Sequence, residues 1–370
     1  MNLRRAFQGA VILAACVFAC IGCQSRSASE PRQAAQSQDI FFPPEPDAPR
    51  VQFLQHVTGS TDVEKAPSPF AKFLLGDEAE KPKSIGKPFG VAIFKGRIYV
   101  CDTMANNVVV LDLENRTFGK FGQKGPGRLS KPVSIRTDKD GLLYVCDTQR
   151  KQVIVFNPDG EYVTAYGKEG DFYPADVAMT PTELYVLDLK EHSIKVYDLK
   201  TRELKRTLGK RGNQPGEFNY PTNLVIDGSG NIYVSDSLNF RVQKISPEGK
   251  PLLQFGQAGQ TPGSFARPKG IAVDNNGIIY VVDSILHVVQ LFDQEGRALM
   301  HIGEGGEGPG QLALPAQAVI DYNNLDYFRK YISADFDAKY LVIVTNQLGR
   351  NKLSIFAFGE RKSVQASKSN

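Results

Sequence analysis

A four-residue motif, Tyr-Val-x-Asp, occurs five times along this chain of 370 residues. Its copies begin at Tyr99, Tyr144, Tyr185, Tyr233 and Tyr280, so the successive intervals are 45, 41, 48 and 47 residues. A period of about 40 to 50 residues with a strand-forming centre is typical of the blades of a β-propeller. The repeat therefore predicts an all-β fold for most of the chain. It also predicts that residues recurring in every copy are structural.

The unit between Arg267 and Gly303 indicates how one repeat folds. It contains four short apolar stretches separated by turns, and the first turn, Asn275-Asn276-Gly277, favours a tight hairpin. Four strands joined in this way predict one antiparallel sheet whose two faces pack on the neighbouring blades. Equivalent units cover residues 87–122, 131–167, 173–209 and 220–256, and a sixth begins at Leu314.

The fourth unit carries the most specific run of residues, Asp236-Ser237-Leu238-Asn239-Phe240-Arg241-Val242. Together with the recurring proline before the first strand, Gly-x-Ile-Tyr-Val-x-Asp in the second and Phe-Gly at the end, this run resembles the NHL repeat. The resemblance is strong over residues 87–303 and weaker over residues 314–358. It implies a six-bladed propeller.

The sixth unit lacks a fourth strand of its own. Its first three strands are expected within residues 316–322, 340–346 and 352–358, and a polar tail, residues 360–370, follows. The segment from Arg50 to Val57 has a strand-like pattern and no place in another unit. Because an open sheet edge invites pairing with other chains, we expect this N-terminal strand to close the last blade. The predicted propeller thus spans residues 50–359.

The first residues are typical of an export signal. Arg4 and Arg5 precede an uncharged apolar run from Gly9 to Gly22. This run is shorter than the ~20 residues that a membrane-spanning helix needs. We therefore predict a signal peptide over residues 1–22.

The end of this run indicates the kind of signal. Cys23 follows a small residue and precedes polar sequence, which resembles a bacterial lipobox in which the cysteine is lipidated. Cys20 is a weaker match, and an ordinary secretory signal is the alternative. In this resemblance Gln24 implies the outer membrane of the cell envelope. Residues 23–49, like residues 360–370, hold few apolar side chains and are expected to be disordered, the first stretch as a tether.

The cysteines beyond the signal region are Cys101 and Cys146. Both occupy the third position of the motif, in consecutive repeats, so one blade separates them. Packed sheets lie about 10 Å apart, whereas the Cα atoms of a disulfide lie about 4.4 to 6.8 Å apart. We therefore predict two buried free thiols.

The net charge of the chain is small. The formal charge is +4, and loss of residues 1–22 removes two arginines and no acidic residue, which leaves about +2. This value does not indicate an obligatory polyanionic partner. Because export separates the chain from the cytoplasm, we expect no nucleic acid partner.

The repeat explains several residues that resemble catalytic or ligand-binding residues. The aspartate of each motif ends a strand, where a carboxylate accepts hydrogen bonds from turn amides. The glycine-rich stretches 122–127, 209–216 and 303–310 lack the Gly-Lys-Ser/Thr of a phosphate loop and connect consecutive units. His192 and His287 share one repeat slot, and no third ligand accompanies them to make a zinc site. We predict no catalytic residue.

The centre of the ring offers one candidate metal site. The residue two positions after each blade-opening proline is expected near the mouth of the central channel. These residues are Gly90, Ser134, Asp176, Asn223, Gly270 and Gln317. Asp176 and Asn223 fall in neighbouring blades and carry the oxygen ligands that Ca²⁺ prefers. We favour a hydrated channel without a cofactor, because one carboxylate alone is present, and keep Ca²⁺ as the alternative.

Basic and aromatic residues are expected around the same mouth. The candidate ligand-binding residues are Lys87, Lys131, Tyr173, Tyr220, Arg267 and Lys269, with Arg150 and Arg241 from the loops between the second and third strands. Such residues suit carbohydrate, peptide or anionic polymer recognition. A solvated rim without a ligand is the alternative.

Two segments depart from the repeat. Residues 67–78 place Phe70, Phe73 and Leu74 at helical spacing, which predicts a short helix capping one end of the ring. Residues 322–339 lengthen the sixth unit. They are either a functional insertion or a helix packed over the channel mouth.

Two classes of function remain open. The first is a membrane-anchored binding or scaffold lipoprotein that recognises a protein, peptide or glycan of the cell envelope through one propeller face. The second is a metal-assisted lyase or hydrolase with a site at the channel, like the amidating lyases or lactonases that resemble this fold. A scaffold for exported electron-transfer proteins is a further option, although the chain itself has no Cys-x-x-Cys-His haem motif. We prefer the binding function.

Overall fold

The structure is a computed structural model that describes residues 39–76, 81–168 and 171–362. The predicted signal peptide, Cys23 and the tether up to residue 38 lie outside the described residues. No helix among the described residues is long and apolar enough to cross a membrane.

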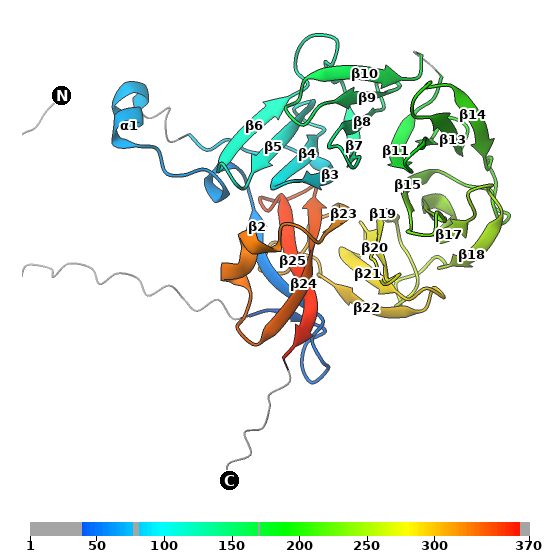
Figure 1. The fold of residues 1–370 in the computed structure, drawn as a ribbon. Helices are drawn as coiled ribbons and strands as arrows, with labels where there is room; N and C mark the ends of the chain where they lie inside the picture. The colour runs from blue at the N-terminus through cyan, green and yellow to red at the C-terminus, as the bar shows by residue number, and fades with distance from the viewer. Residues whose placement is uncertain (1–38, 77–80, 169–170, 363–370) are drawn as a thin grey trace, which may run out of the picture. The chain divides into compact units, whose positions relative to one another are not determined.

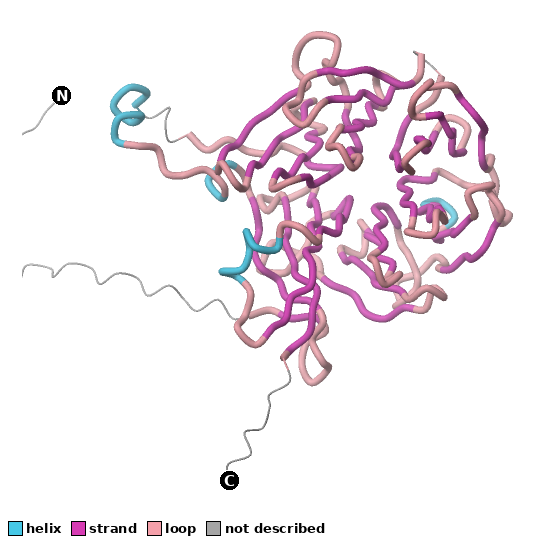
Figure 2. The backbone as a smooth tube through the Cα atoms, in the orientation of Figure 1, coloured by secondary structure: helices cyan, strands magenta, loops and turns pink. Residues whose placement is uncertain are grey.

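Six antiparallel sheets form a ring, as the repeat predicts (Figure 1). Strands are the main regular secondary structure of the described residues, among which helical segments are few and short (Figure 2). In blades 1 to 5 the four strands of a sheet follow one another in the chain, and the first strand is innermost. The strands of blades 1 and 2 are β3 Pro88–Phe94, β4 Arg97–Asp102, β5 Asn107–Asp112, β6 Thr117–Phe121, β7 Pro132–Thr137, β8 Leu143–Asp147, β9 Gln152–Phe156 and β10 Tyr162–Tyr166. Those of blade 3 are β11 Pro174–Met179, β12 Glu183–Asp188, β13 Ser193–Asp198 and β14 Leu204–Leu208. Those of blades 4 and 5 are β15 Pro221–Ile226, β16 Ile232–Asp236, β17 Arg241–Ile245, β18 Pro251–Phe255, β19 Pro268–Val273, β20 Ile279–Asp283, β21 Val288–Phe292 and β22 Ala298–Ile302.

The sixth blade joins the two ends of the folded chain. Its sheet has the order β1-β2-β25-β24-β23, in which β23 Pro315–Asp321, β24 Phe336–Asn346 and β25 Leu353–Arg361 are C-terminal. The strand β2, Val51–Val57, pairs antiparallel with β25 and supplies the missing strand, as predicted. The first strand β23 also contacts β3 of blade 1, so the ring is closed.

The outer limits of this blade differ from the prediction. A short strand β1, Phe41–Phe42, pairs with β2 and adds a fifth strand. This strand lies within residues 23–49, the stretch predicted to be a disordered tether. The folded part of the chain therefore begins earlier than predicted. At the other end β25 continues to Arg361, so the strand extends two residues beyond the predicted end of the propeller.

The core consists of six apolar clusters, one between each pair of adjacent blades. Between blades 1 and 2, for example, Tyr99 and Cys101 pack against Ile135 and Val145. Each motif strand therefore contributes side chains to both faces of its blade, as expected for strands buried on both sides. Cys101 and Cys146 are fully buried free thiols, as predicted, and burial raises the pKa of both.

The motif aspartates are structural. In blade 1, Asp102 accepts hydrogen bonds from the amides of Gly86 and Lys87, which lead into the first strand. It also accepts from the amides of Met104 and Ala105 in the turn that follows the second strand. One carboxylate thus fixes two loops at one end of the blade.

The two non-repeat segments fold as short helices but occupy unexpected places. Helix α1, Pro69–Leu75, forms where predicted, yet Phe73 and Leu74 are 83% and 62% exposed, so neither caps the ring. The 3-10 helix η4, Leu325–Tyr331, contacts β2 and β24 and buries Phe328 in the core between blades 6 and 1. It therefore packs on the body of the sixth blade and not over the centre of the ring (Figure 1).

Candidate functional site at the mouth of the propeller

One face of the ring is defined by the way the first two strands of each blade pair. The opening proline of the first strand lies opposite the last residue of the second strand, as Pro88 does to Asp102 and Pro315 to Asn346. The start of every first strand and the turn after every second strand therefore share one end of the blade. We call this side of the ring the mouth face.

A β-bulge follows the proline in all six first strands. The extra residue changes which side chain each position presents. The residues two positions after the proline, predicted to lie at the channel mouth, are buried between neighbouring blades instead. A side chain at Gly90 would come within 2.6 Å of the Cα atom of Ser134, and one at Gly270 within 2.6 Å of that of Gln317. Partly exposed side chains occur one residue earlier, at Phe89, Val133, Thr222 and Lys269.

Asp176 and Asn223 lie together, but within a network that joins three blades. The Asp176 carboxylate is fully buried and accepts hydrogen bonds from Ser134 Oγ at 2.5 Å and Arg136 Nη2 at 2.8 Å. It also accepts from Asn223 Nδ2 at 3.0 Å and from the amides of Val177 and Leu224. The Oδ1 atom therefore has donors from blades 2 and 3, and the Oδ2 atom has donors from blades 2 and 4.

This network favours a structural role for the pair. Asn223 presents its amide nitrogen to Asp176, and the Arg136 guanidinium already neutralises the carboxylate. A Ca²⁺ ion would have to displace that arginine to reach the carboxylate oxygens. Among the described residues, no group of three or more His, Cys, Asp or Glu side chains is placed to hold a metal ion.

A cluster of cations occupies the mouth face over blades 5, 6 and 1. Lys269 reaches from blade 5 to blade 1, where its Nζ lies 5.0 Å from the centre of the Phe89 ring. Ala316 takes the corresponding position in the intervening blade, and its single methyl group leaves room for this crossing. Burial, together with the nearby charges of Arg267 and Lys87, lowers the pKa of Lys269 to about 8.

The three cations of this cluster have no ion-pair partner among the described residues. None of Lys87, Arg267 and Lys269 forms an ion pair with a carboxylate in the described part of the chain. A partly desolvated lysine beside two like charges is unfavourable unless an anion approaches. The arrangement can therefore bind a carboxylate, a sulfate or a phosphate group.

The remaining predicted rim residues continue around the same face. Lys131 is exposed, and the Tyr173 and Tyr220 side chains are 38% and 41% exposed. Lys151 from the neighbouring turn places its Nζ 5.1 Å from the centre of the Tyr173 ring. These residues of blades 2, 3 and 4 add flat apolar surface and positive charge to the mouth face.

His192 and His287 position two of the rim residues. In blades 4 and 6 the residues before the proline, Tyr220 and Leu314, have left-handed φ angles of 54° and 52°. Their amides therefore turn to the preceding blade and donate to His192 Nδ1 at 3.2 Å and to His287 Nδ1 at 3.1 Å. In blades 1 and 5 the equivalent amides, of Lys87 and Arg267, bond to the motif aspartate of their own blade.

Two predicted ligand-binding arginines are engaged within the fold. Arg241 is 9% exposed and donates to Asp236, Gln254 and two backbone carbonyls. The prediction that this side chain is exposed to a ligand is therefore wrong. Arg150 donates to the carbonyls of Pro126 and Arg128 in the connector before its blade. Both arginines thus hold the connector before their own blade. Their position in the sequence, just after the second strand, did not indicate these contacts.

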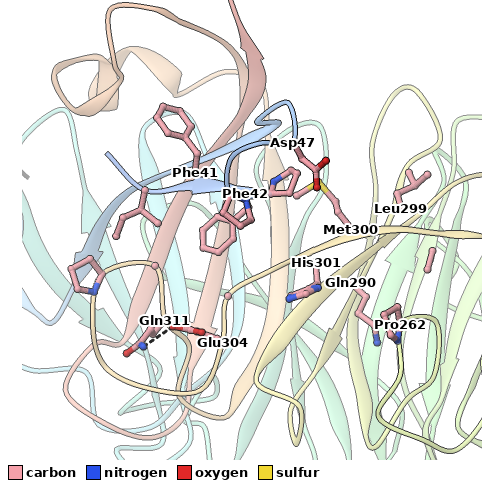
Figure 3. A pocket seen from close by; sticks show the side chains of 17 residues that line it. Phe41, Phe42, Asp47, Pro262, Gln290, Leu299, Met300, His301, Glu304 and Gln311 are labelled. Atoms are coloured by element: carbon pink, nitrogen blue, oxygen red, sulfur yellow. Dashed lines mark hydrogen bonds between the residues drawn. The ribbon is translucent and has the colours of Figure 1, made fainter. Parts of the chain in front are cut away.

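A separate groove lies between β1 and β22 (Figure 3). It has a volume of about 840 Å³, and its lining includes Phe42, Leu299, Met300 and His301. Glu304 accepts a hydrogen bond from Gln311 across one side of it. Its titratable lining residues are Asp47, His301 and Glu304, and sequence reasoning gave no signal for the groove.

Comparison with known proteins supports the architecture. Residues 218–245, in the fourth blade, match the family model of the NHL repeat. This stretch contains the Asp236-to-Val242 run that carries the resemblance in the sequence. The chain is thus a six-bladed β-propeller that contains an NHL repeat.

Solved structures share the same fold at low sequence identity. A gluconolactonase from Xanthomonas campestris is 14% identical with a TM-score of 0.55, covering 83% of this chain and 98% of its own. A protein of unknown function from Bacteroides thetaiotaomicron is 18% identical with a TM-score of 0.55, covering 84% of this chain and 76% of its own. Virginiamycin B lyase from Staphylococcus aureus is 13% identical with a TM-score of 0.50, covering 74% and 85%. At these identities the likeness extends to the fold alone.

Proposed function

We propose that this chain is a binding propeller of the cell envelope that holds an anionic group of a protein, peptide or glycan partner at its mouth face. The observation that carries the proposal is the unpaired cluster of Lys87, Arg267 and Lys269 around Phe89. An anion placed there relieves the repulsion among the three cations and gains from the low dielectric around Lys269.

The ring supplies a rigid base for this cluster. Lys87 and Arg267 are held at their amides by Asp102 and Asp283, and the first strands of blades 2 to 4 are joined by the Asp176 network. Binding therefore requires little reordering of the backbone, which preserves affinity.

The alternative, a metal-assisted lyase or hydrolase, has the fold likeness in its favour. The gluconolactonase and virginiamycin B lyase structures share the ring at 14% and 13% identity. A shared ring does not carry an activity with it, and no constellation among the described residues points to that chemistry. Binding remains the function that a specific cluster supports.

We further propose that the propeller is held at the membrane by lipidation of Cys23, on the outer membrane of the envelope. The lipobox-like sequence before Gln24 supports this proposal. A lipid anchor would keep the mouth face close to envelope partners and raise their effective concentration.

The proposal is tested by titrating the protein with fluorescein-labelled pentaglutamate and with a sulfated oligosaccharide at low and at moderate ionic strength. We expect the double variant Lys87→Met and Lys269→Met to weaken binding about tenfold, equivalent to about 1.4 kcal/mol. The control variant Lys120→Met and Lys250→Met removes the same charge from exposed positions outside the mouth face and should change binding less than twofold. Equal losses in both variants would mean that net charge alone attracts the probe, and would refute the site.

A further inference from the structure

Exposed apolar side chains recur at one position of the mouth face. The position is the second residue after the end of the second strand, in the turn that leads to the third. It holds Met104, Leu238, Ile285 and Leu348, which are 70%, 50%, 50% and 53% exposed. We call these four residues the apolar arc.

The fold does not require apolar side chains in these turns. The amides of Met104 and Ile285 donate to the motif aspartates, both at 3.0 Å. In blades 2 and 3 the same position is polar, Gln149 and Lys190, and their amides make the same bond at 3.1 and 2.8 Å. The amides of Leu238 and Leu348 donate instead to the carbonyls of Asn219 and Ala313. Backbone contacts therefore hold all four turns and do not depend on the apolar side chains.

The arc follows the cation cluster. Blades 4, 5, 6 and 1, which carry the arc, are consecutive in the ring, and blades 5 and 1 also supply Arg267, Lys269 and Lys87. The polar blades 2 and 3 lie on the other side. The mouth face thus combines positive charge at the start of the first strands with aliphatic side chains in the surrounding turns.

Resting on the binding function proposed above, we infer that the ligand is a protein segment in which a carboxylate is flanked by aliphatic or aromatic side chains. Charge complementarity assigns the carboxylate to Lys87, Arg267 and Lys269. The flanking side chains would cover the apolar arc, because exposed aliphatic groups, and methionine in particular, are typical of protein interfaces.

Other partners fit this surface less well. Glycans present hydroxyl groups and stack on aromatic rings, whereas the arc is aliphatic. A membrane surface presents its charges in one plane, whereas Lys269 is largely buried against Phe89 and is reached by a single projecting group.

The inference is tested with the full chain and a displayed library of random twelve-residue peptides. We expect enriched peptides to combine Asp or Glu with Leu, Ile, Phe or Met. A synthetic peptide of the enriched sequence should lose affinity about tenfold when its acidic residue is changed to the amide, and likewise when its apolar residues are changed to serine.

Matched variants then locate the contact. The arc variant carries Leu238→Ser, Ile285→Ser and Leu348→Ser, and we expect it to bind the peptide about tenfold more weakly. The control variant carries Leu204→Ser, Leu252→Ser and Leu299→Ser, which are 50%, 53% and 53% exposed on the outermost strands of three blades, and should bind as the unchanged protein does. Thermal unfolding of both variants confirms that each retains the fold.

The outcomes separate this inference from the function on which it rests. If pentaglutamate binding depends on Lys269 but no apolar peptide is enriched, or if the arc variant binds the peptide normally, the inference is wrong and the binding function stands. Stronger arc-dependent binding to phosphatidylglycerol vesicles, or to a sulfated oligosaccharide, would overturn it in favour of a lipid or glycan. If the binding of neither pentaglutamate nor the peptide depends on Lys269, the binding function itself is wrong.

Discussion

Lys269 illustrates what one residue contributes to the mouth face. Its pKa of about 8, lowered by burial and by Arg267 and Lys87, makes its charge dependent on pH in a range where other lysines stay protonated. An anion at the mouth stabilises the protonated form and so must raise this pKa.

The first prediction concerns this titration. Pentaglutamate stays fully ionised above pH 6, so its affinity should fall as pH rises through about 8 and the Lys269 charge is lost. Titrations from pH 6.5 to 9.5 measure the effect. The variant Lys269→Met should bind weakly at every pH, without this transition; a transition that persists in the variant would assign it to another group.

The same shift predicts a sign for stability. The folded protein releases the Lys269 proton at about pH 8 and the unfolded chain at the ordinary value of 10.5, so between these values the unfolded chain binds more protons. The contribution of Lys269 to the free energy of unfolding should therefore rise as pH increases from about 8 to 10.5. Denaturant unfolding of the unchanged protein and of Lys269→Met measures it as the difference between the two curves.

Asp176 gives the second prediction. The substitution Asp176→Asn leaves the guanidinium of Arg136 beside a neutral amide. The Arg136 side chain is 17% exposed, and the side chain at position 176 is fully buried. Breaking a buried ion pair in this way costs about 3 to 5 kcal/mol of unfolding free energy, measured by urea denaturation. The matched control Asp140→Asn breaks an exposed pair with Lys139 and should cost less than about 1 kcal/mol. If D176N unfolds like the control, the network does not stabilise the ring.

At the scale of the element, the repeat predicts strands well and their fine register poorly. The Tyr-Val-x-Asp strands, the structural aspartates and the closing strand followed from periodicity, because each depends on local pattern or on one unpaired edge. The bulge after each proline follows from pairing geometry, and it moves the partly exposed position from Asn223 to Thr222 and from Gly270 to Lys269.

Contacts between blades explain most of what the sequence left open. Lys269 lies near Phe89 because two blades bring residues 180 positions apart to one end of the ring, and no local pattern records this. Arg241 was assigned to a ligand although it bonds to carbonyls of the connector before its blade. Helix α1 has the expected spacing of apolar residues, yet Phe73 and Leu74 find no surface on the ring.

The third prediction concerns the closing strand. Val51, Leu54 and Val57 of β2 are buried, and burial of each such side chain contributes about 1.5 to 3 kcal/mol. A chain that starts at Thr58 loses these contacts and exposes the edge of β25, so we expect it to unfold more than 10 °C lower or to aggregate. A chain that starts at Asp39 keeps β1 and β2 and should unfold at the temperature of the full chain. Unchanged melting of the shorter chain, followed by circular dichroism, would show that the ring closes without β2.

At the scale of the whole molecule, net charge conceals the charge distribution. The chain carries 44 basic and 40 acidic residues, and this balance argued against an obligatory polyanionic partner. Folding places Lys87, Arg267 and Lys269 at one end of the ring, where their side chains form no ion pair with any described residue. Many other lysines and arginines, such as Lys195 and Arg206, are paired within their blades. A near-neutral protein can thus present a positive face, which only the arrangement of the blades defines.

The fourth prediction concerns the anchor of the whole molecule. If Cys23 carries a lipid, Cys23→Ser should move the protein from the membrane fraction to the soluble envelope fraction, because the substitution removes the acyl chains that hold it at the bilayer. Cys20→Ser changes the weaker of the two candidate positions and should leave the protein in the membrane fraction. Fractionation followed by mass spectrometry of the mature N-terminus measures both results, and release by the Cys20 variant alone would place the lipid three residues earlier. Since neither substitution changes a residue of the ring, pentaglutamate binding should be equal in both variants. A loss of partner capture in cells with C23S would then report the contribution of anchoring and not of the mouth face.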